Sequence, residues 1–390
     1  MKFDVNRLMM LEAAKSTAKI APSNSPLEVL NGILVESCAD TGLTFLTATD
    51  HQISIQQKVM ASVKESGAML INSRILVGMM TLLRGEFVTF SADKPQLITV
   101  TSGKSMYRIN CLPAKSYPKP VMPFPEESVI MSGICSLAKR TTFLVSKDDK
   151  KPALQCVNIK LRNNAVHATA TDGMGMMLVK DSAESTEERE FLLPGYALGV
   201  LASISDDSDV FEVSDTGKNI VFVRGDMIFT IRKMATGDYI DTNSLVKNIK
   251  PLYAALTETG KMKAALSLIS AGTRLGAAHT PINLILSDNE IILRCNSDHS
   301  EGNTSVPANV SRSTPDTGFY YDVSALLKLF NVLNGKVKLE LDAKGFMMIK
   351  TRSEVYLQSP MRPPVKKPKA VKPAKEKESA EGAEDMKVTA

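Results

Sequence analysis

The sequence predicts an α+β fold of three similar domains in tandem, each with two helices packed on an antiparallel sheet. The principal observation is a repeat. Leu43-Thr-Phe-Leu-Thr-Ala-Thr-Asp50 recurs as Ala165-Val-His-Ala-Thr-Ala-Thr-Asp172 and, more loosely, as Ile291-Ile-Leu-Arg-Cys-Asn-Ser-Asp298. A second match pairs Met106-Tyr-Arg-Ile-Asn and Tyr117 with Ile228-Phe-Thr-Ile-Arg and Tyr239. Spacings of 122 and 126 residues between the closing aspartates correspond to a whole domain rather than a solenoid unit.

Each copy has the same order of elements: a helix, three short strands, a second helix and three more strands. Apolar residues at helical spacing predict helices near 5–20, 73–84, 132–146, 194–205, 259–272 and 323–333. Pro194 suits the first turn of its helix. Alternating segments predict the strands, near 28–37, 43–49, 52–60, 86–91, 96–102, 105–110, 155–162, 165–171, 175–181, 209–214, 218–224, 227–233, 282–288, 290–296, 300–309, 336–342, 345–351 and 354–359.

The expected domains are residues 1–125, 126–247 and 248–363, followed by a disordered tail at 364–390 that is rich in Lys, Pro and Glu. No run of 18 apolar residues and no secretory signal is found, so we expect a cytoplasmic protein without a membrane partner. The five cysteines are scattered, and no pair of the four histidines has the spacing of a metal site. The sequence therefore predicts neither a metal nor a cofactor.

An enzyme would have to use Asp50, Asp172 and Asp298 as a metal-binding cluster. Each aspartate ends the same strand in its own repeat, which separates the three, so turn capping explains them better. The chain also lacks a GxxxxGK[ST] loop for ATP. The sequence thus favours a non-catalytic protein. An unrelated binding or adhesion array also fits the repeats, but it predicts no basic bias on the helices.

Three short segments carry a family resemblance: Met1-Lys-Phe at the start, Ala170-Thr-Asp-Gly173, and Ser359-Pro-Met-Arg362. Over residues 1–362 the chain resembles the beta sliding clamp family, the processivity subunit of bacterial DNA polymerase III. The resemblance implies a head-to-tail homodimeric ring of six domains whose helices surround double-stranded DNA without sequence specificity. It also implies as partners the DNA polymerase III alpha subunit, the clamp loader complex and other proteins that carry a clamp-binding motif.

The residues expected to face DNA are basic residues of the helices and of adjoining loops. Phosphate contacts allow sliding because they carry no sequence information. Taken singly, each of these residues also fits a solvated helix face. The set is Arg7, Lys15, Lys19, Arg74, Lys139, Arg140, Lys147, Lys150, Lys151, Lys261, Lys263, Arg274 and Lys328.

The resemblance further implies a pocket for a partner peptide between the second and third domains. Residues carried over to it, or replacing family residues within it, are Leu154, Thr171, Gly173, Met174, Gly175, Met176, Pro360, Met361 and Arg362. Where the family has Gly-His-Arg-Leu, this chain has Gly-Met-Gly-Met from Gly173; Ser359 and Pro363 also depart from the family's C-terminal Met-Pro-Met-Arg-Leu. We expect an apolar pocket with altered preference, since methionine makes an adaptable surface. Met176 and Met177 alternatively face the core.

Such departures suit a clamp from a bacteriophage, a mobile element or a divergent bacterium. Function has one close alternative, a clamp-derived decoy or regulator that binds replication proteins without encircling DNA. Dimer closure separates the two.

Overall fold

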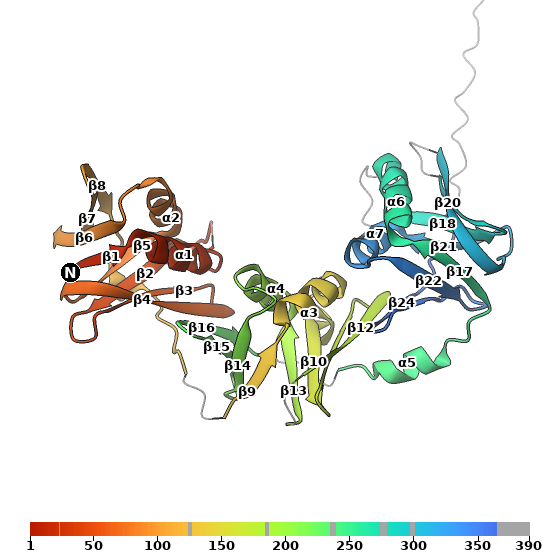
Figure 1. Cartoon of the computed structure of the whole chain (residues 1–390), viewed down its shortest axis with the longest axis horizontal. Coiled ribbons are helices and arrows are strands. Elements are labelled where there is room, and N and C mark those ends of the chain that lie inside the picture. Colours follow the sequence, from red (N-terminus) through yellow and green to blue (C-terminus); the bar gives the residue numbers. More distant parts are fainter. Residues whose placement is uncertain are drawn as a thin grey trace, which may run out of the picture.

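The computed structural model of the chain describes residues 1–22, 24–94, 96–123, 127–183, 187–234, 239–273, 279–296 and 301–364. In Figure 1 these residues form three units along an arc, with a pair of helices on the concave side of each unit. The predicted residues Arg274 and Asp298 and the segment 365–390 lie outside the described residues.

The first unit begins with a strand that the sequence did not predict. Its elements are β1 (Lys2–Asn6), α1 (Arg7–Ala18), β2 (Gly32–Cys38), β3 (Leu43–Thr49), β4 (Ile53–Glu65), β5 (Gly67–Asn72), α2 (Ser73–Leu82), β6 (Phe87–Lys94), β7 (Leu97–Ser102) and β8 (Ser105–Asn110).

The second unit repeats this order. Its elements are β9 (Val129–Ser132), α3 (Ile134–Thr141), β10 (Cys156–Arg162), β11 (Ala165–Thr171), β12 (Gly175–Ser182), β13 (Arg189–Pro194), α4 (Gly195–Ser203), β14 (Val210–Asp215), β15 (Asn219–Arg224) and β16 (Met227–Arg232). Pro194 ends β13 and precedes the first turn of α4, rather than lying within that turn.

The third unit follows a connecting helix, α5 (Thr242–Asn248), that the sequence also did not predict. Its elements are β17 (Tyr253–Glu258), α6 (Thr259–Thr273), β18 (Pro281–Ser287), β19 (Glu290–Asn296), β20 (Glu301–Arg312), β21 (Phe319–Asp322), α7 (Val323–Val332), β22 (Lys336–Leu341), β23 (Met347–Lys350) and β24 (Glu354–Gln358).

Each unit is thus two copies of strand, helix and three strands, and the prediction of six strands per unit is wrong. The missed strands run without a loop into the helices. Asn6 marks one boundary, because its Oδ1 accepts the backbone N–H groups of Leu8 at 3.0 Å and Met9 at 3.3 Å. Asn72 and Asp322 cap α2 and α7 in the same way. The predicted helix at 5–20 therefore begins at Arg7.

The third repeat is offset by one residue from the match seen in the sequence. In the hairpins β3–β4, β11–β12 and β19–β20, the residue pairs next to the turn contain Thr49, Thr171 and Asn296, respectively. The residue after Thr49 is Asp50, whereas Asp298 comes two after Asn296. The strand of the third repeat thus begins one residue earlier than the sequence match placed it, and Asp298 itself lies outside the described residues.

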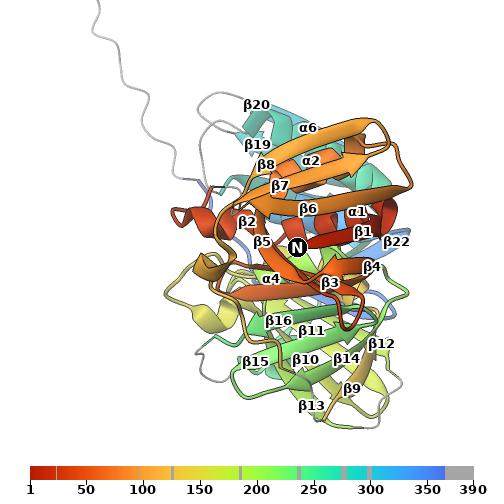
Figure 2. The ribbon, with the colours of Figure 1, turned by 90° about the vertical axis from the view of Figure 1, so that its left-hand side faces the viewer.

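Neighbouring units join edge to edge by strand pairing. β4 of the first unit pairs antiparallel with β16 of the second, from Ile53↔Ile231 to Gln57↔Met227. β12 of the second unit pairs with β24 of the third in the same manner. Each junction continues a sheet from one unit into the next. The helices pack in pairs, α1 with α2, α3 with α4 and α6 with α7, and Figure 2 views the arc from the end of the first unit.

Arg140, predicted to face DNA, instead joins the second unit to the third. Its side chain is 15% exposed, and the guanidinium contacts the Asp181 carboxylate of β12 and lies 3.4 Å from Glu354 Oε1 of β24. The prediction that Arg140 contacts DNA is not kept, because its charge is already neutralised at this junction.

Arg7 also has a structural role within its unit. Its Nε donates to Gly85 O at 3.1 Å and its Nη1 to Met80 O at 3.0 Å, at the C-terminal end of α2. Met80 O belongs to the last turn of α2, where the carbonyls lack helical partners and the helix dipole is negative, and Gly85 O lies in the loop that follows. We therefore do not include Arg7 among the residues proposed to bind DNA.

Arg140→Ala should lower the free energy of unfolding by about 2 kcal/mol, because it leaves two partly buried carboxylates without their cation. Neighbouring Lys139→Ala is the matched control. Lys139 pairs with Asp207 in solvent, where the loss should stay below about 1 kcal/mol. Urea unfolding followed by circular dichroism measures both variants; equal stabilities would contradict the assigned role of Arg140.

Candidate functional site

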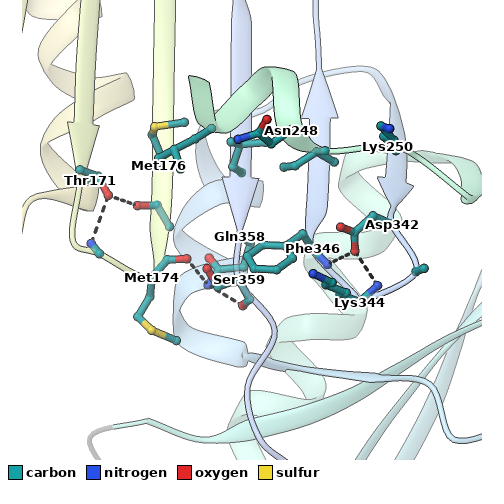
Figure 3. A pocket seen from close by; sticks show the side chains of 16 residues that line it. Thr171, Met174, Met176, Asn248, Lys250, Asp342, Lys344, Phe346, Gln358 and Ser359 are labelled. Carbon is teal, nitrogen blue, oxygen red and sulfur yellow. Dashed lines mark hydrogen bonds between the residues drawn. The ribbon is translucent and has the colours of Figure 1, made fainter. Parts of the chain in front are cut away.

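A cavity of about 450 Å³ lies where β12, β24, α5 and the turn between β22 and β23 meet (Figure 3). It is lined by Thr171, Gly173, Met174, Gly175, Met176, Leu245, Asn248, Ile249, Lys250, Asp342, Ala343, Lys344, Phe346, Leu357, Gln358 and Ser359. The strand pairing that joins the second and third units thus also places the two sides of the cavity.

The turn from β11 to β12 forms one side of the cavity. Asp172 Oδ1 accepts the backbone N–H groups of Met174 and Gly175, both at 2.8 Å, and Gly173 has a φ of 90°. Thr171 Oγ1 donates to Gly175 O at 2.7 Å. These bonds fix the turn so that Met174 is 43% exposed at the cavity. Capping explains Asp172, as the sequence predicted.

The end of β24 forms the facing side. Gln358 is 1% exposed, and its Nε2 donates to Met174 O at 3.3 Å across the junction. The hydroxyl of Tyr356 donates to Gln358 Oε1. Burial raises the pKa of Tyr356 far above its ordinary value, so this hydroxyl stays protonated and remains a donor. The backbone N–H of Ser359 donates to Met174 O at 2.9 Å and closes the junction.

The floor of the cavity is apolar. Met176, Met348 and Leu357 are buried together, and Val246 and Ile249 from the α5 region pack against them. Leu245, at the mouth, is 47% exposed. Met177 is fully buried in the main core and does not line the cavity. An apolar floor with a few polar groups at the mouth suits a short peptide anchor.

The mouth of the cavity is positively charged. Lys250 and Lys344 are exposed, and both lie on the side of the cavity that faces Met174 and Met176. Within the described part of the chain, neither ammonium group forms an ion pair. The carboxylate of Asp342 accepts the backbone N–H groups of Lys344 and Phe346, both at 2.8 Å, which uses it to hold its own turn.

Five of the nine predicted pocket residues line the cavity, namely Thr171, Gly173, Met174, Gly175 and Met176. Leu154 is buried behind Gly173. Pro360, Met361 and Arg362 do not line it, and the backbone N–H of Met361 donates to Tyr320 O at 2.7 Å.

The sequence analysis missed the residues from α5 and from the turn after β22. The apolar pair Leu245-Val246, followed by Ile249, repeats at helical spacing and was the available signal, but this segment was treated as a domain boundary.

The first junction contains a cavity at the matching place, about 370 Å³ in volume, but its lining is polar. Three apolar residues of the second junction have polar counterparts here: Ser54 for Met176, Thr230 for Leu357 and Asn219 for Phe346. Arg232 also lines it. Of these two cavities, the one at the second junction is suited to an apolar side chain.

Basic residues dominate the six helices on the concave side. Together α1, α2, α3, α4, α6 and α7 contain eight basic residues and one acidic residue, Glu12. Of the predicted set, the exposed residues are Lys15, Lys19, Arg74, Lys139, Lys147, Lys150, Lys151, Lys261, Lys263 and Lys328. Helix α4 has no basic residue, so the positive charge lies on the other five helices.

Two other kinds of site find no support in the described ranges. No group of three or more His, Cys, Asp or Glu side chains is placed to hold a metal ion. Among the helices that the structure describes, none is long and apolar enough to cross a membrane.

Comparison with known proteins bears on the family and on the fold. Residues 1–123 match the family described as the DNA polymerase III beta subunit, N-terminal domain, and residues 131–241 match its central domain. The chain belongs to the beta sliding clamp family. These clamps are non-catalytic processivity factors of DNA replication.

The chain is a divergent member of the family. It is 26% identical to the beta sliding clamp of Bacillus subtilis over 261 residues, which cover 63% of this chain and 68% of that relative. A relative from Staphylococcus epidermidis is 26% identical over 257 residues, 63% of this chain and 67% of the relative.

Solved structures extend the likeness in fold over nearly the whole chain. The beta subunit from DNA polymerase of Streptococcus pyogenes matches with a TM-score of 0.82 at 20% identity, over 93% of this chain and 100% of that chain. A DNA polymerase III beta subunit of Thermotoga maritima matches with a TM-score of 0.81 at 16% identity, over the same shares. The third unit therefore also has the clamp fold.

Gly175→Ala should disturb the junction beneath the cavity. A Cβ at this position would lie 2.9 Å from Gln358 Oε1 and 3.0 Å from Leu144 Cδ2, which forces buried groups to move. We expect a loss of about 1–3 kcal/mol in the free energy of unfolding. Gly199→Ala in α4, where a Cβ meets nothing within 4 Å, should be neutral or slightly stabilising. Thermal unfolding of the two variants compares them directly, and equal melting temperatures would contradict this packing.

Proposed function

We propose that this chain is a DNA sliding clamp. Two copies close head to tail into a ring of six domains, 1–125, 126–247 and 248–363 from each chain. The ring encircles duplex DNA and tethers the replicative DNA polymerase, the clamp loader and other partners through short peptides bound in the cavity at the second junction.

The observation that carries ring closure is the way the units already join. The last strand of the second unit, β16, pairs with β4, and the last strand of the third, β24, pairs with β12. If ring closure follows the same pattern, β8, the last strand of the first unit, pairs with β20 in the third unit of the other chain. β20 is the counterpart of β4 and β12, because each is the fourth strand of its unit. In the described ranges, β8 pairs with β7 alone, and residues 301–307 of β20 pair on one side with β19. Unpaired edges such as those of β8 and β20 can form hydrogen bonds with a strand of another chain.

Side chains on β8 support the same pairing. Tyr107, Phe229 and Tyr356 occupy equal places on β8, β16 and β24, opposite Val100, Phe222 and Ile349 of the preceding strands. Phe229 and Tyr356 are 0% and 1% exposed at their junctions, whereas Tyr107 is 50% exposed. Phe229 pairs with Ile55 and Tyr356 with Met177. If β8 pairs with β20 of the other chain in the same register, Tyr107 lies opposite Gly302, which is the counterpart of Ile55 and Met177. A glycine there leaves room for the ring.

DNA binding is supported by the placement of charge. Six of the exposed basic residues belong to helices on the concave side, which a closed ring would turn toward the duplex (Figure 1). A concave surface with excess positive charge attracts the phosphate backbone of DNA without contacts that depend on the base sequence.

Partner binding is supported by the chemistry of the cavity. Met174, Met176 and Leu245 offer an adaptable apolar surface, and the nearby lysines favour a peptide that carries acidic residues.

Tyr107→Lys tests ring closure, because an ammonium group at the edge would be buried without a counter-ion on pairing. Light scattering should give a mass near twice 42.4 kDa for the unchanged chain and a shift toward 42.4 kDa for the variant. Val121→Lys, at a side chain 82% exposed outside the strands, should leave the mass unchanged. A stable monomer of the unchanged chain would favour the decoy or regulator over the clamp.

The combined variant Lys15→Glu, Lys263→Glu and Lys328→Glu tests DNA contact on three helices. Each lost phosphate contact should reduce the slope of log affinity against log salt by about 0.9. Lys218→Glu, in the exposed turn between β14 and β15, is the control and should leave the slope unchanged. Fluorescence anisotropy with a duplex at several salt concentrations gives the slopes. Equal slopes for the unchanged chain and the triple variant would show that these three lysines do not contact DNA.

A further inference from the structure

The segment 365–390 has two parts of opposite charge. Residues 366–377 contain six lysines and one glutamate. Residues 378–390 contain four acidic residues and one lysine, and within them Glu384 and Asp385 directly precede Met386. The second part therefore combines an unbranched apolar side chain with adjacent carboxylates.

The cavity at the second junction has the complementary features. Its floor of Met176 and Leu357 accepts an apolar side chain, and Lys250 and Lys344 at the mouth carry charges without an ion-pair partner in the described ranges. Carboxylates next to an apolar anchor would meet these ammonium groups.

We propose that the chain's own segment 384–388 binds in this cavity, with Met386 on the apolar floor and Glu384 and Asp385 at Lys250 and Lys344. The inference rests on the proposed role of the cavity as a peptide site. It makes the C-terminal segment an internal ligand that partner peptides must displace.

The length of the intervening chain permits this contact. Ser359 lines the cavity, and the five residue steps to Pro364 carry the chain at most about 18 Å away. Pro364 and Met386 are 22 residue steps apart, and a random coil of that length has a root-mean-square span of about 25 Å. A tether matched to its span gives an effective concentration in the millimolar range, so a weak contact suffices.

Competing positions on the molecule fit the segment less well. The cavity at the first junction has Ser54, Thr230 and Asn219 where an apolar floor is needed. The basic helices would attract the carboxylates but give Met386 no cavity. Residues 366–377 cannot replace the acidic part, because their lysines would be repelled by Lys250 and Lys344.

Tryptophan fluorescence tests the proposal in the full chain, which contains no tryptophan of its own. Met386→Trp should emit at shorter wavelength and be less quenched by acrylamide than Val371→Trp, which places the same reporter in the basic part. The difference should not depend on protein concentration, because the contact lies within one chain. Equal emission and quenching of the two variants would overturn the proposal.

A second change locates the contact. Leu245→Asp, at the half-exposed mouth of the cavity, should return the emission of Met386→Trp to that of Val371→Trp, and Lys250→Glu should shift it in the same direction. Leu256→Asp, at a side chain 41% exposed on β17, should have no effect. A shift that persists in Leu245→Asp would place Met386 elsewhere and also overturn the proposal.

Polymerase binding separates this inference from the function on which it rests. If Leu245→Asp abolishes polymerase binding while Met386→Trp emits as an exposed residue, the cavity is a peptide site and the internal ligand is wrong. If Leu245→Asp leaves polymerase binding unchanged, the proposed function of the cavity is wrong, whatever the fluorescence. Met386→Asp should strengthen polymerase binding several-fold, because it removes the internal competitor.

Discussion

Antiparallel pairing between the edge strands of neighbouring units is the interaction on which the rest of the structure depends. β4–β16 and β12–β24 turn three separate units into one arc and fix the helices on its concave side. The second junction brings the start of β12 beside the end of β24 and thereby forms the cavity. A partly buried network of Arg140, Asp181 and Glu354 reinforces it. Ring closure in the proposed function is a third use of this same pairing.

The two junctions show how one backbone arrangement acquires different chemistry. Matching positions are polar at the first and apolar at the second, although the strands pair in the same register. Hydrogen bonds among Asp172, Gln358 and the backbone of Met174 hold the second cavity in shape without filling it. Met174 and Met176 then supply an adaptable apolar surface.

Much of the fold could be predicted from the sequence, because repetition and alternation are local patterns. The strands that lead into the helices were missed, since β1 passes into α1 at Asn6 without a loop or glycine to mark the change. The pocket was predicted in part: the turn at Asp172 is a local motif, whereas Phe346 and Leu245 reach the cavity only through tertiary packing. The contacts of Arg7 and Arg140 could not be predicted for the same reason, because partners 73 and 214 residues away cannot be inferred from spacing.

The central claim is that two copies close around DNA, and topology tests it most directly. The protein is loaded onto nicked circular DNA with a cognate clamp loader and ATP, and its retention is measured before and after the circle is cut once. A ring should remain on the circle and be lost through the free ends after cutting. Retention that does not change when the circle is linearised would contradict encirclement and leave a protein that binds replication factors without enclosing DNA.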